Sequence, residues 1–379
     1  MRKASSIFAI AVIIICVVIS FKNLGFFPTD FSDVNLTYEN SPTDRVYYDK
    51  LTENAKIAYT LILPELPKHT EKIEIPKLSD SELDSLMYAI SYDNPELICY
   101  GRSCEMFLEG GKYYFKPFYS HTKAECDACR ERFQAALDIA LKAIPQNADD
   151  YTKELAIHDY ICKNCRYVAD DYNNLKISPY DMLVNGEAVC EGYARTAQLL
   201  LNLSGVRNYL VTGESDVTGS GSAGHMWNVV TVGGENYYLD VTWDDIDEQT
   251  NEIDGCYLYF NVPEEIISRD HFNIVPSNNN CTSYEYNYYS VNNSLYTTYD
   301  HTQQTHLENA IHRNTKNSKS ICEMYFTNEE AYQRAVKELV DESKILDLLG
   351  ESNKTYGTSF REVAYYSFQN AYYIRFVFS

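Results

Sequence analysis

The sequence predicts an α+β fold, in which a group of helices is followed along the chain by antiparallel strands. Apolar residues recur at spacings of three and four, the period of an amphipathic helix, over 124–144, 149–165 and 190–204. Two strand-like runs then flank Gly233-Gly234, which is typical of a β-hairpin. Helices followed by consecutive antiparallel strands favour an α+β arrangement over alternating βαβ units.

The other elements follow from local signals. A helix from Ser81 should end before Asn94-Pro95, because the residue before proline avoids helical geometry. Gly110-Gly111 should join two strands, and Gly205 should stop the helix that starts at Cys190. The remaining expected elements are a strand at 208–212, a strand at 320–326, a helix at 328–349 with a Thr327/Glu330 capping box and an end at Gly350, and a hairpin over 361–378.

These elements predict five segments. They are a signal anchor or signal peptide at 1–25, a tether and lead-in at 26–80, a main domain at 81–275 with its core at 150–275, an Asn- and Tyr-rich linker at 276–318, and a small C-terminal α/β unit at 319–379.

The first segment predicts export. Arg2 and Lys3 precede the uncharged run Ala4 to Phe21, which spans 18 residues. This is close to the length of a membrane-spanning helix and slightly longer than the apolar part of a cleaved signal. Positive charge before it directs the rest of the chain out of the cytoplasm. We expect an extracytoplasmic protein, with an uncleaved membrane anchor favoured over a cleaved signal and secretion.

Charge and cysteine content narrow the function classes. A net charge of -22 argues against a nucleic-acid partner, because phosphates would be repelled. Eleven cysteines in an exported chain favour disulfides. For the pairs Cys126/Cys129 and Cys162/Cys165, each on one face of a predicted helix, we expect disulfides first, then structural zinc, buried free thiols and a redox pair.

Three residues in order can support nucleophilic catalysis. Cys190 lies at the start of a helix, where the free N–H groups and helix dipole favour a thiolate and can hold an oxyanion. In a hairpin turning at Gly233-Gly234, positions that sum to about 467 face each other, so His225 and Asp240 come within reach after a small offset. Each residue alone is ordinarily a core, strand or turn residue, but together they predict a thiol, a base and an orienting carboxylate.

The blocks around these residues resemble a known family. "VCEGYA", "GHMWNVV" and "YYLDVTWDD" are similar to the three core blocks of the transglutaminase-like superfamily. Further similarity extends through "IHDYICKNCRY", "SPYDMLVNGEAVC" and "YLYFNVPEEIISRDH". It is weaker over 81–149, where "DNPELICY" lies before the core. The resemblance covers about 150–275 strongly. It implies a papain-like core, with the nucleophile helix packed on an antiparallel sheet, and a catalytic triad of Cys190, His225 and Asp240.

The resemblance also implies roles around the triad. Trp227 and Trp243 should shield the ion pair from water. The Cys190 N–H should form the oxyanion hole, with a second donor near Tyr180. The residues expected to support the helix start and the histidine strand are Glu191, Tyr193 and Asn228.

Other polar residues are interpreted more simply. His158 should bond within the core, and His271 should lie in a loop without a catalytic role. The acidic cluster Asp244, Asp245, Asp247 and Glu248 is expected to be a solvated loop rather than a calcium site. We therefore expect neither a metal nor a cofactor.

The reaction itself stays open. The family contains acyltransferases that transfer to an amine, peptidases that transfer to water, and inactive binding modules. A protein or peptide amide is the expected substrate, including peptide associated with the cell wall. A structural role, with the Tyr-rich tail making surface contacts, is a further alternative.

Overall fold

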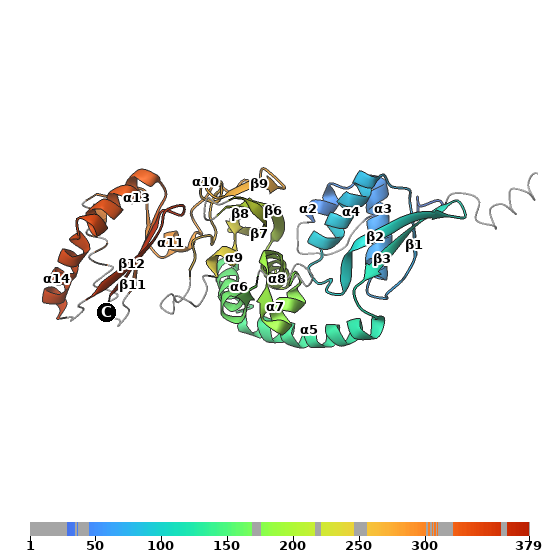
Figure 1. Ribbon diagram of the computed structural model, residues 1–379, viewed down its shortest axis with the longest axis horizontal. Helices are drawn as coiled ribbons and strands as arrows, with labels where there is room; N and C mark the ends of the chain where they lie inside the picture. The colour runs from blue at the N-terminus through green and yellow to red at the C-terminus, as the bar shows by residue number, and fades with distance from the viewer. Residues whose placement is uncertain are drawn as a thin grey trace, which may run out of the picture.

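A computed structural model describes most of the chain (Figure 1). The described residues are 29–34, 36, 45–168, 176–216, 221–245, 256–300, 302, 303, 305, 307, 309, 321–357 and 362–378. The predicted export segment lies outside these ranges. None of the described helices has the length and apolar character needed to cross a bilayer.

The region before the main domain is folded. Its helices α2 (Val46–Asp49), α3 (Glu53–Ile62) and α4 (Asp80–Tyr92) pack beside a sheet of order β1-β3-β2, formed by Ile73–Ile75, Lys112–Tyr119 and Tyr100–Glu109. The short helix η1 (Leu63–Glu65) follows α3. Tyr59, Leu86 and Phe115 lie in one buried cluster of this unit. The prediction of a tether and lead-in at 26–80 is therefore wrong for 46–78, which buries apolar surface of its own.

The predicted α4 and the β2–β3 hairpin are confirmed. Helix α5 (Lys123–Ala143) then runs from the N-terminal unit to the central domain (Figure 1). There it contacts α6 (Asp150–Asn164) and α7 (Pro179–Asn185), which in turn pack against α8 (Cys190–Leu203). Leu137, Ile161 and Leu200 share the buried cluster of these helices.

The helix that begins at Cys190 packs against a four-stranded antiparallel sheet of order β8-β7-β6-β9. The strands are Glu235–Leu239, Ala223–Val232, Asn208–Ser215 and His271–Val275. The expected register is confirmed, because Asn228 faces Leu239 and Val232 faces Glu235. Strand β8 ends at Leu239, however, and residues Val241–Asp244 form the short helix α9 instead of more strand. The α+β class is thus confirmed.

The predicted linker at 276–318 is wrong for 281–299, because those residues pack into the fold. Cys281 and Tyr289 are buried in a cluster behind the sheet, and the Asn287 side-chain amide donates to the Phe260 carbonyl at 3.0 Å. The short helix α10 (Glu264–Ile267) precedes this segment, and α11 (Tyr288–Val291) and β10 (Leu295–Tyr296) lie within it. Strand β10 pairs in parallel with β11 of the C-terminal unit.

The C-terminal unit differs from the prediction in its helix. Its sheet has the order β10-β11-β13-β12, with β11 at Ile321–Phe326 and the expected hairpin at Val363–Phe368 and Tyr373–Phe378. Asn328, rather than Thr327, caps the helix, because its side chain accepts from the Ala331 N–H. The helix is divided into α13 (Glu329–Val336), a π-helical turn (Lys337–Asp341) and α14 (Lys344–Tyr356), and it continues through Gly350.

Candidate active site

The candidate nucleophile lies in a cleft beside the sheet. Cys190 is half-buried at the first position of α8, and its N-cap, Val189, makes no side-chain hydrogen bond to the helix. The free N–H groups of this first turn are therefore available to an anion. The cleft has a volume of about 610 Å³, which is in the range of small-molecule and peptide sites.

Local structure fixes the entry to α8. Gly186 ends α7 in the left-handed conformation with φ of 71°, and the chain turns back as β5 (Glu187–Ala188). That strand pairs in parallel with β4 (Arg166–Tyr167), while the Val189 N–H donates to the Lys176 carbonyl at 2.9 Å. The segment directly before Cys190 is thus fixed by its pairing with β4 and by the bond from Val189 to Lys176.

His225 and Asp240 meet at one end of the hairpin. His225 is on β7 and lines the cleft beside Cys190. Its Nε2 donates to Asp240 Oδ2 at 2.6 Å. Since β8 ends at Leu239, Asp240 turns toward His225 without the small offset in register that the sequence interpretation allowed. The other ring nitrogen, Nδ1, is not used by this bond, and the Cys190 thiol, which lines the same cleft, raises the pKa of the imidazole.

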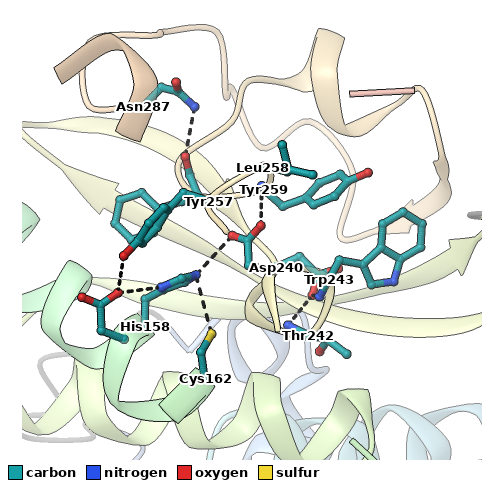
Figure 2. Close-up of polar contacts among 12 residues, drawn as sticks. His158, Cys162, Asp240, Thr242, Trp243, Tyr257, Leu258, Tyr259 and Asn287 are labelled. Carbon is teal, nitrogen blue, oxygen red and sulfur yellow. Dashed lines mark hydrogen bonds and ion pairs between the residues drawn. The ribbon is translucent and has the colours of Figure 1, made fainter. Parts of the chain in front are cut away.

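Four hydrogen bonds hold the buried Asp240 carboxylate. Oδ1 accepts from the N–H groups of Thr242 and Trp243 at 3.0 and 3.3 Å, as Figure 2 also shows. Oδ2 accepts from His225 and, at 3.1 Å, from Nε2 of His271. Burial raises the pKa of Asp240, but the charge and hydrogen bonds of the two histidines outweigh it and hold that pKa well below its ordinary value.

The same contacts favour a protonated His225. Burial lowers the pKa of His225, yet the charge and hydrogen bond of Asp240, together with the Cys190 thiol, raise it to about 10. The imidazole is therefore charged at neutral pH. A charged imidazole beside a sulfur atom stabilises a thiolate.

The two tryptophans enclose the histidine, as predicted from their positions. The Trp227 ring stacks on His225 with centroids 5.5 Å apart, and Trp243 lies 5.7 Å from it. Trp227 is almost fully buried. These rings keep water away from His225 and Asp240, which strengthens the electrostatic interaction between them.

Asn228, Tyr193 and Glu191 connect the elements around the site. The Asn228 amide donates to the Ala194 carbonyl at 3.0 Å and so ties β7 to α8. The Tyr193 hydroxyl donates to Asp245, beyond α9. Glu191 is buried in the first turn of α8, with its carboxylate 3.6 Å from Arg195.

Tyr180 lies elsewhere, which contradicts the interpretation of its region as a second oxyanion donor. It is on α7, where its ring faces Phe133 and Arg132. It lines a separate cavity of about 490 Å³ between α5, α7 and the N-terminal unit.

His271 was missed by the sequence interpretation, which placed it in a loop. It begins β9, is fully buried and pairs with Ser215 of β6. Besides Asp240, it contacts Asp270, with Nδ1 2.7 Å from Oδ1. An acidic residue directly before a histidine was the available signal.

His158 forms a second buried network, which confirms its expected role in the core. Its Nε2 lies 3.2 Å from Asp244 Oδ2 and 3.9 Å from the Cys162 sulfur (Figure 2). Asp244 also accepts from the Tyr259 N–H at 2.9 Å, and burial raises the pKa of this aspartate to about 6. Asp244 thus joins α6 to the segment behind the site. It is buried, contrary to the solvated loop expected for the acidic cluster.

The cysteine pairs do not form the expected disulfides. All ten cysteines in the described part of the chain are free thiols. In each pair the two side chains lie along the same segment, Cys126/Cys129 on α5 and Cys162/Cys165 at the end of α6. Both Cys162 and Cys165 line the cleft.

One cluster has the composition of a metal site. Among the described residues, His225, Asp240 and His271 bring one ligand atom each to within 4.8 Å of one another. Both imidazoles already donate to the same carboxylate oxygen, so hydrogen bonds alone account for the arrangement.

These features define an α+β protein in which a thiol, an imidazole and a carboxylate meet at one cleft. Residues 138–243 match the sequence model of the transglutaminase-like superfamily. These residues carry a transglutaminase-like domain, which confirms the resemblance seen in the sequence.

Two named relatives match part of the chain. Kyphoscoliosis peptidase from Mus musculus is 27% identical over 173 residues, and that from Homo sapiens is 28% identical over 173 residues. Each match covers 42% of this chain and 26% of the relative, so the chain spans about a quarter of those proteins. A crystal structure of a TGase is 16% identical, with a TM-score of 0.27, over 45% of this chain and 50% of that one.

Proposed function

We propose that the protein is a cysteine-dependent enzyme that forms an acyl-enzyme from a protein or peptide amide and passes the acyl group to an amine or to water. The observation that carries this proposal is the 2.6 Å hydrogen bond of His225 to Asp240 at the wall of a cleft that Cys190 also lines.

The chemistry assigns one role to each residue. The Cys190 thiolate attacks the amide carbonyl carbon, and the first-turn N–H groups of α8 stabilise the oxyanion. The C–N bond then breaks, and His225 gives its proton to the leaving amine, which leaves a thioester. In the second step His225 takes a proton from the incoming water or amine, the C–S bond breaks, and the thiolate returns. Asp240 orients His225 and stabilises its charged form throughout.

Hydrolysis alone is the second candidate. The similar relatives are named peptidases, which favours water as the acceptor. A binding module that uses the same cleft without turnover is the alternative outside enzymes. For the place of action we propose the outside of the cytoplasmic membrane, because two basic residues precede the apolar run at 4–21.

The direct test is incubation with a glutamine-containing peptide and a fluorescent primary alkylamine. Mass spectrometry would score amine incorporation against release of the hydrolysed product. We expect at least one product from the wild-type protein and none from Cys190→Ala. Cys129→Ala, which changes a cysteine on α5 outside the cleft, should keep the wild-type rate. No product with a broad set of peptides, or equal turnover in Cys190→Ala, would contradict the enzymatic proposal.

A further inference from the structure

His271 lies between two carboxylates, and its geometry differs from that of an ordinary core histidine. Its Nε2 is 3.1 Å from Asp240 Oδ2, and its Nδ1 is 2.7 Å from Asp270 Oδ1. Ionised carboxylates only accept hydrogen bonds. Both ring nitrogens thus face carboxylate oxygens, an arrangement in which the doubly protonated ring can donate to both.

Asp270 is itself held as an acceptor. Its Oδ2 accepts from the Tyr259 hydroxyl at 2.6 Å, and it is 2% exposed. A buried carboxylate without a counter-charge is costly, and the imidazolium of His271 supplies that charge. Two carboxylates and two histidines therefore form one continuous hydrogen-bond network from His225 to Tyr259.

We propose that His271 is a positioning residue for the triad: as a buried cation shared by Asp240 and Asp270, it fixes the Asp240 carboxylate and competes with His225 for the same oxygen. This inference rests on the proposed function, since it assigns how that site is adjusted.

Because His271 and His225 share one oxygen of Asp240, a charge on His271 affects how readily His225 releases its proton. His225 and His271 both donate to Oδ2, and their ring centroids are only 5.4 Å apart. Two like charges at this separation disfavour each other, so a charged His271 makes it easier for His225 to release its proton. Release is needed when His225 protonates the leaving group.

The other ionisable groups around this hydrogen-bond network come from several elements. They are Cys190 on α8, Tyr167 on β4, Asp244 on α9, Tyr259 before α10, and Asp270 next to His271. Among the described residues, His225 and His271 are the basic side chains that donate to the Asp240 carboxylate, while Lys163 and Arg166 line the cleft that His225 shares with Cys190. The rings of Trp227 and Trp243 fill the remaining space, at 4.8 and 4.4 Å from His271.

The experiment is NMR of the protein labelled with ¹⁵N and ¹³C in histidine, which reports the proton on each ring nitrogen without requiring turnover. In the wild-type protein we expect hydrogen on both nitrogens of His271 at neutral pH. His271→Gln retains a donor for Asp240 but removes the charge. In that variant the titration midpoint of His225 should rise by about one pH unit. His158, which belongs to the separate network with Asp244, is the internal reference and should not move.

A second variant tests the same inference in case His271→Gln does not fold. Asp270→Asn leaves Asp240 and His225 unchanged, and His271 should then lose one ring hydrogen at neutral pH. An unprotonated ring nitrogen in wild-type His271, or an unchanged His225 midpoint in His271→Gln, would overturn the inference. Neither result depends on amide turnover, so failure here is distinct from failure of the proposed function.

Discussion

At the scale of single residues, the site depends on where the Asp240 carboxylate points. One of its oxygens receives two backbone N–H groups and the other receives two imidazoles. Because every acceptor position is used, rotation of the carboxylate would leave buried donors unpaired. The orientation of His225 therefore depends on α9 and β9, which fix Asp240, as well as on β7, which carries His225 itself.

Asp240→Asn tests this dependence. The charge of Asp240 raises the pKa of His225 to about 10, so its removal should shift the alkaline limit of amide turnover down, toward the ordinary value of 6.5. We also expect a loss of turnover of about 10³–10⁴-fold, because the wrong tautomer or orientation of the base is favoured. A pH profile of kcat/KM for both proteins measures the two effects. An unchanged alkaline limit would show that Asp240 does not set the charge of His225.

Sequence reasoning located Cys190, His225 and Asp240, because motif order and hairpin register are local properties. It did not find His271, which reaches Asp240 through the pairing of β6 with β9. No short turn relates these strands, since β7, β8 and the segment from Asp240 to Asp270 lie between them in the sequence. A second oxyanion donor was expected near Tyr180, but α7 directs the Tyr180 side chain toward α5.

At the scale of elements, the start of α8 requires a residue without a side chain. A Cβ at Gly192 would lie 2.7 Å from the Ala188 Cβ and 2.8 Å from the Lys176 carbonyl oxygen. The segment that precedes α8 can therefore pack this closely against the first turn of the helix only because position 192 is glycine. This crossing sets the position of the thiol.

Gly192→Ala should consequently displace the first turn of α8. We expect a destabilisation of about 1–3 kcal/mol, typical of overpacking, with a larger loss of Cys190 reactivity than of overall fold. Urea denaturation and alkylation of Cys190 measure the two quantities. Gly350→Ala is the matched control, since a Cβ there meets nothing within 4 Å and the residue lies inside α14; it should be neutral or stabilising by up to about 1 kcal/mol. Equal effects of the two substitutions would contradict the role of Gly192.

In the N-terminal unit, hydrophobic periodicity in the sequence did not predict the helices and strand before residue 80. Pro64, Pro67 and Pro76 interrupt the segment, and β1 has only three residues. Such short elements give no sustained period, yet α3 and α4 bury Tyr59 and Leu86 against the sheet. Their stability comes from tertiary packing, which the sequence pattern does not display.

At the scale of the whole molecule, the units are joined by buried contacts. The Gln198 amide of α8 donates to the Tyr92 carbonyl of the N-terminal unit at 2.8 Å. On the other side, the Tyr325 hydroxyl of β11 donates to the Leu258 carbonyl at 2.9 Å. Tyr259, one residue further, accepts from the Asp240 N–H through its carbonyl. The C-terminal unit therefore supports the segment that lies directly behind the site.

Overall stability should depend on the protonation of Glu154. This residue is fully buried on α6, and burial raises its pKa to about 8 despite a 2.8 Å hydrogen bond from Asn261. In the unfolded chain the ordinary value of 4.5 returns. The folded state thus binds an extra proton between these values, and the free energy of unfolding falls as pH rises from about 4.5 to 8.

Glu154→Gln should remove this fall in the free energy of unfolding with rising pH. We expect the variant to be more stable than the wild type at pH 8.5, by on the order of 1 kcal/mol or more, and similar to it near pH 4.5. Urea unfolding at both pH values provides the comparison. A difference that is the same at the two pH values would mean that Glu154 is not neutral in the folded protein.

The central claim is that Cys190 and His225 form a thiolate–imidazolium pair, and the most direct measurement is alkylation by iodoacetamide near neutral pH, followed peptide by peptide with mass spectrometry. We predict that Cys190 reacts much faster than Cys129 of the same molecule and that His225→Ala removes this advantage. Equal rates for the two cysteines in the wild-type protein, or a Cys190 rate unchanged in His225→Ala, would contradict the claim.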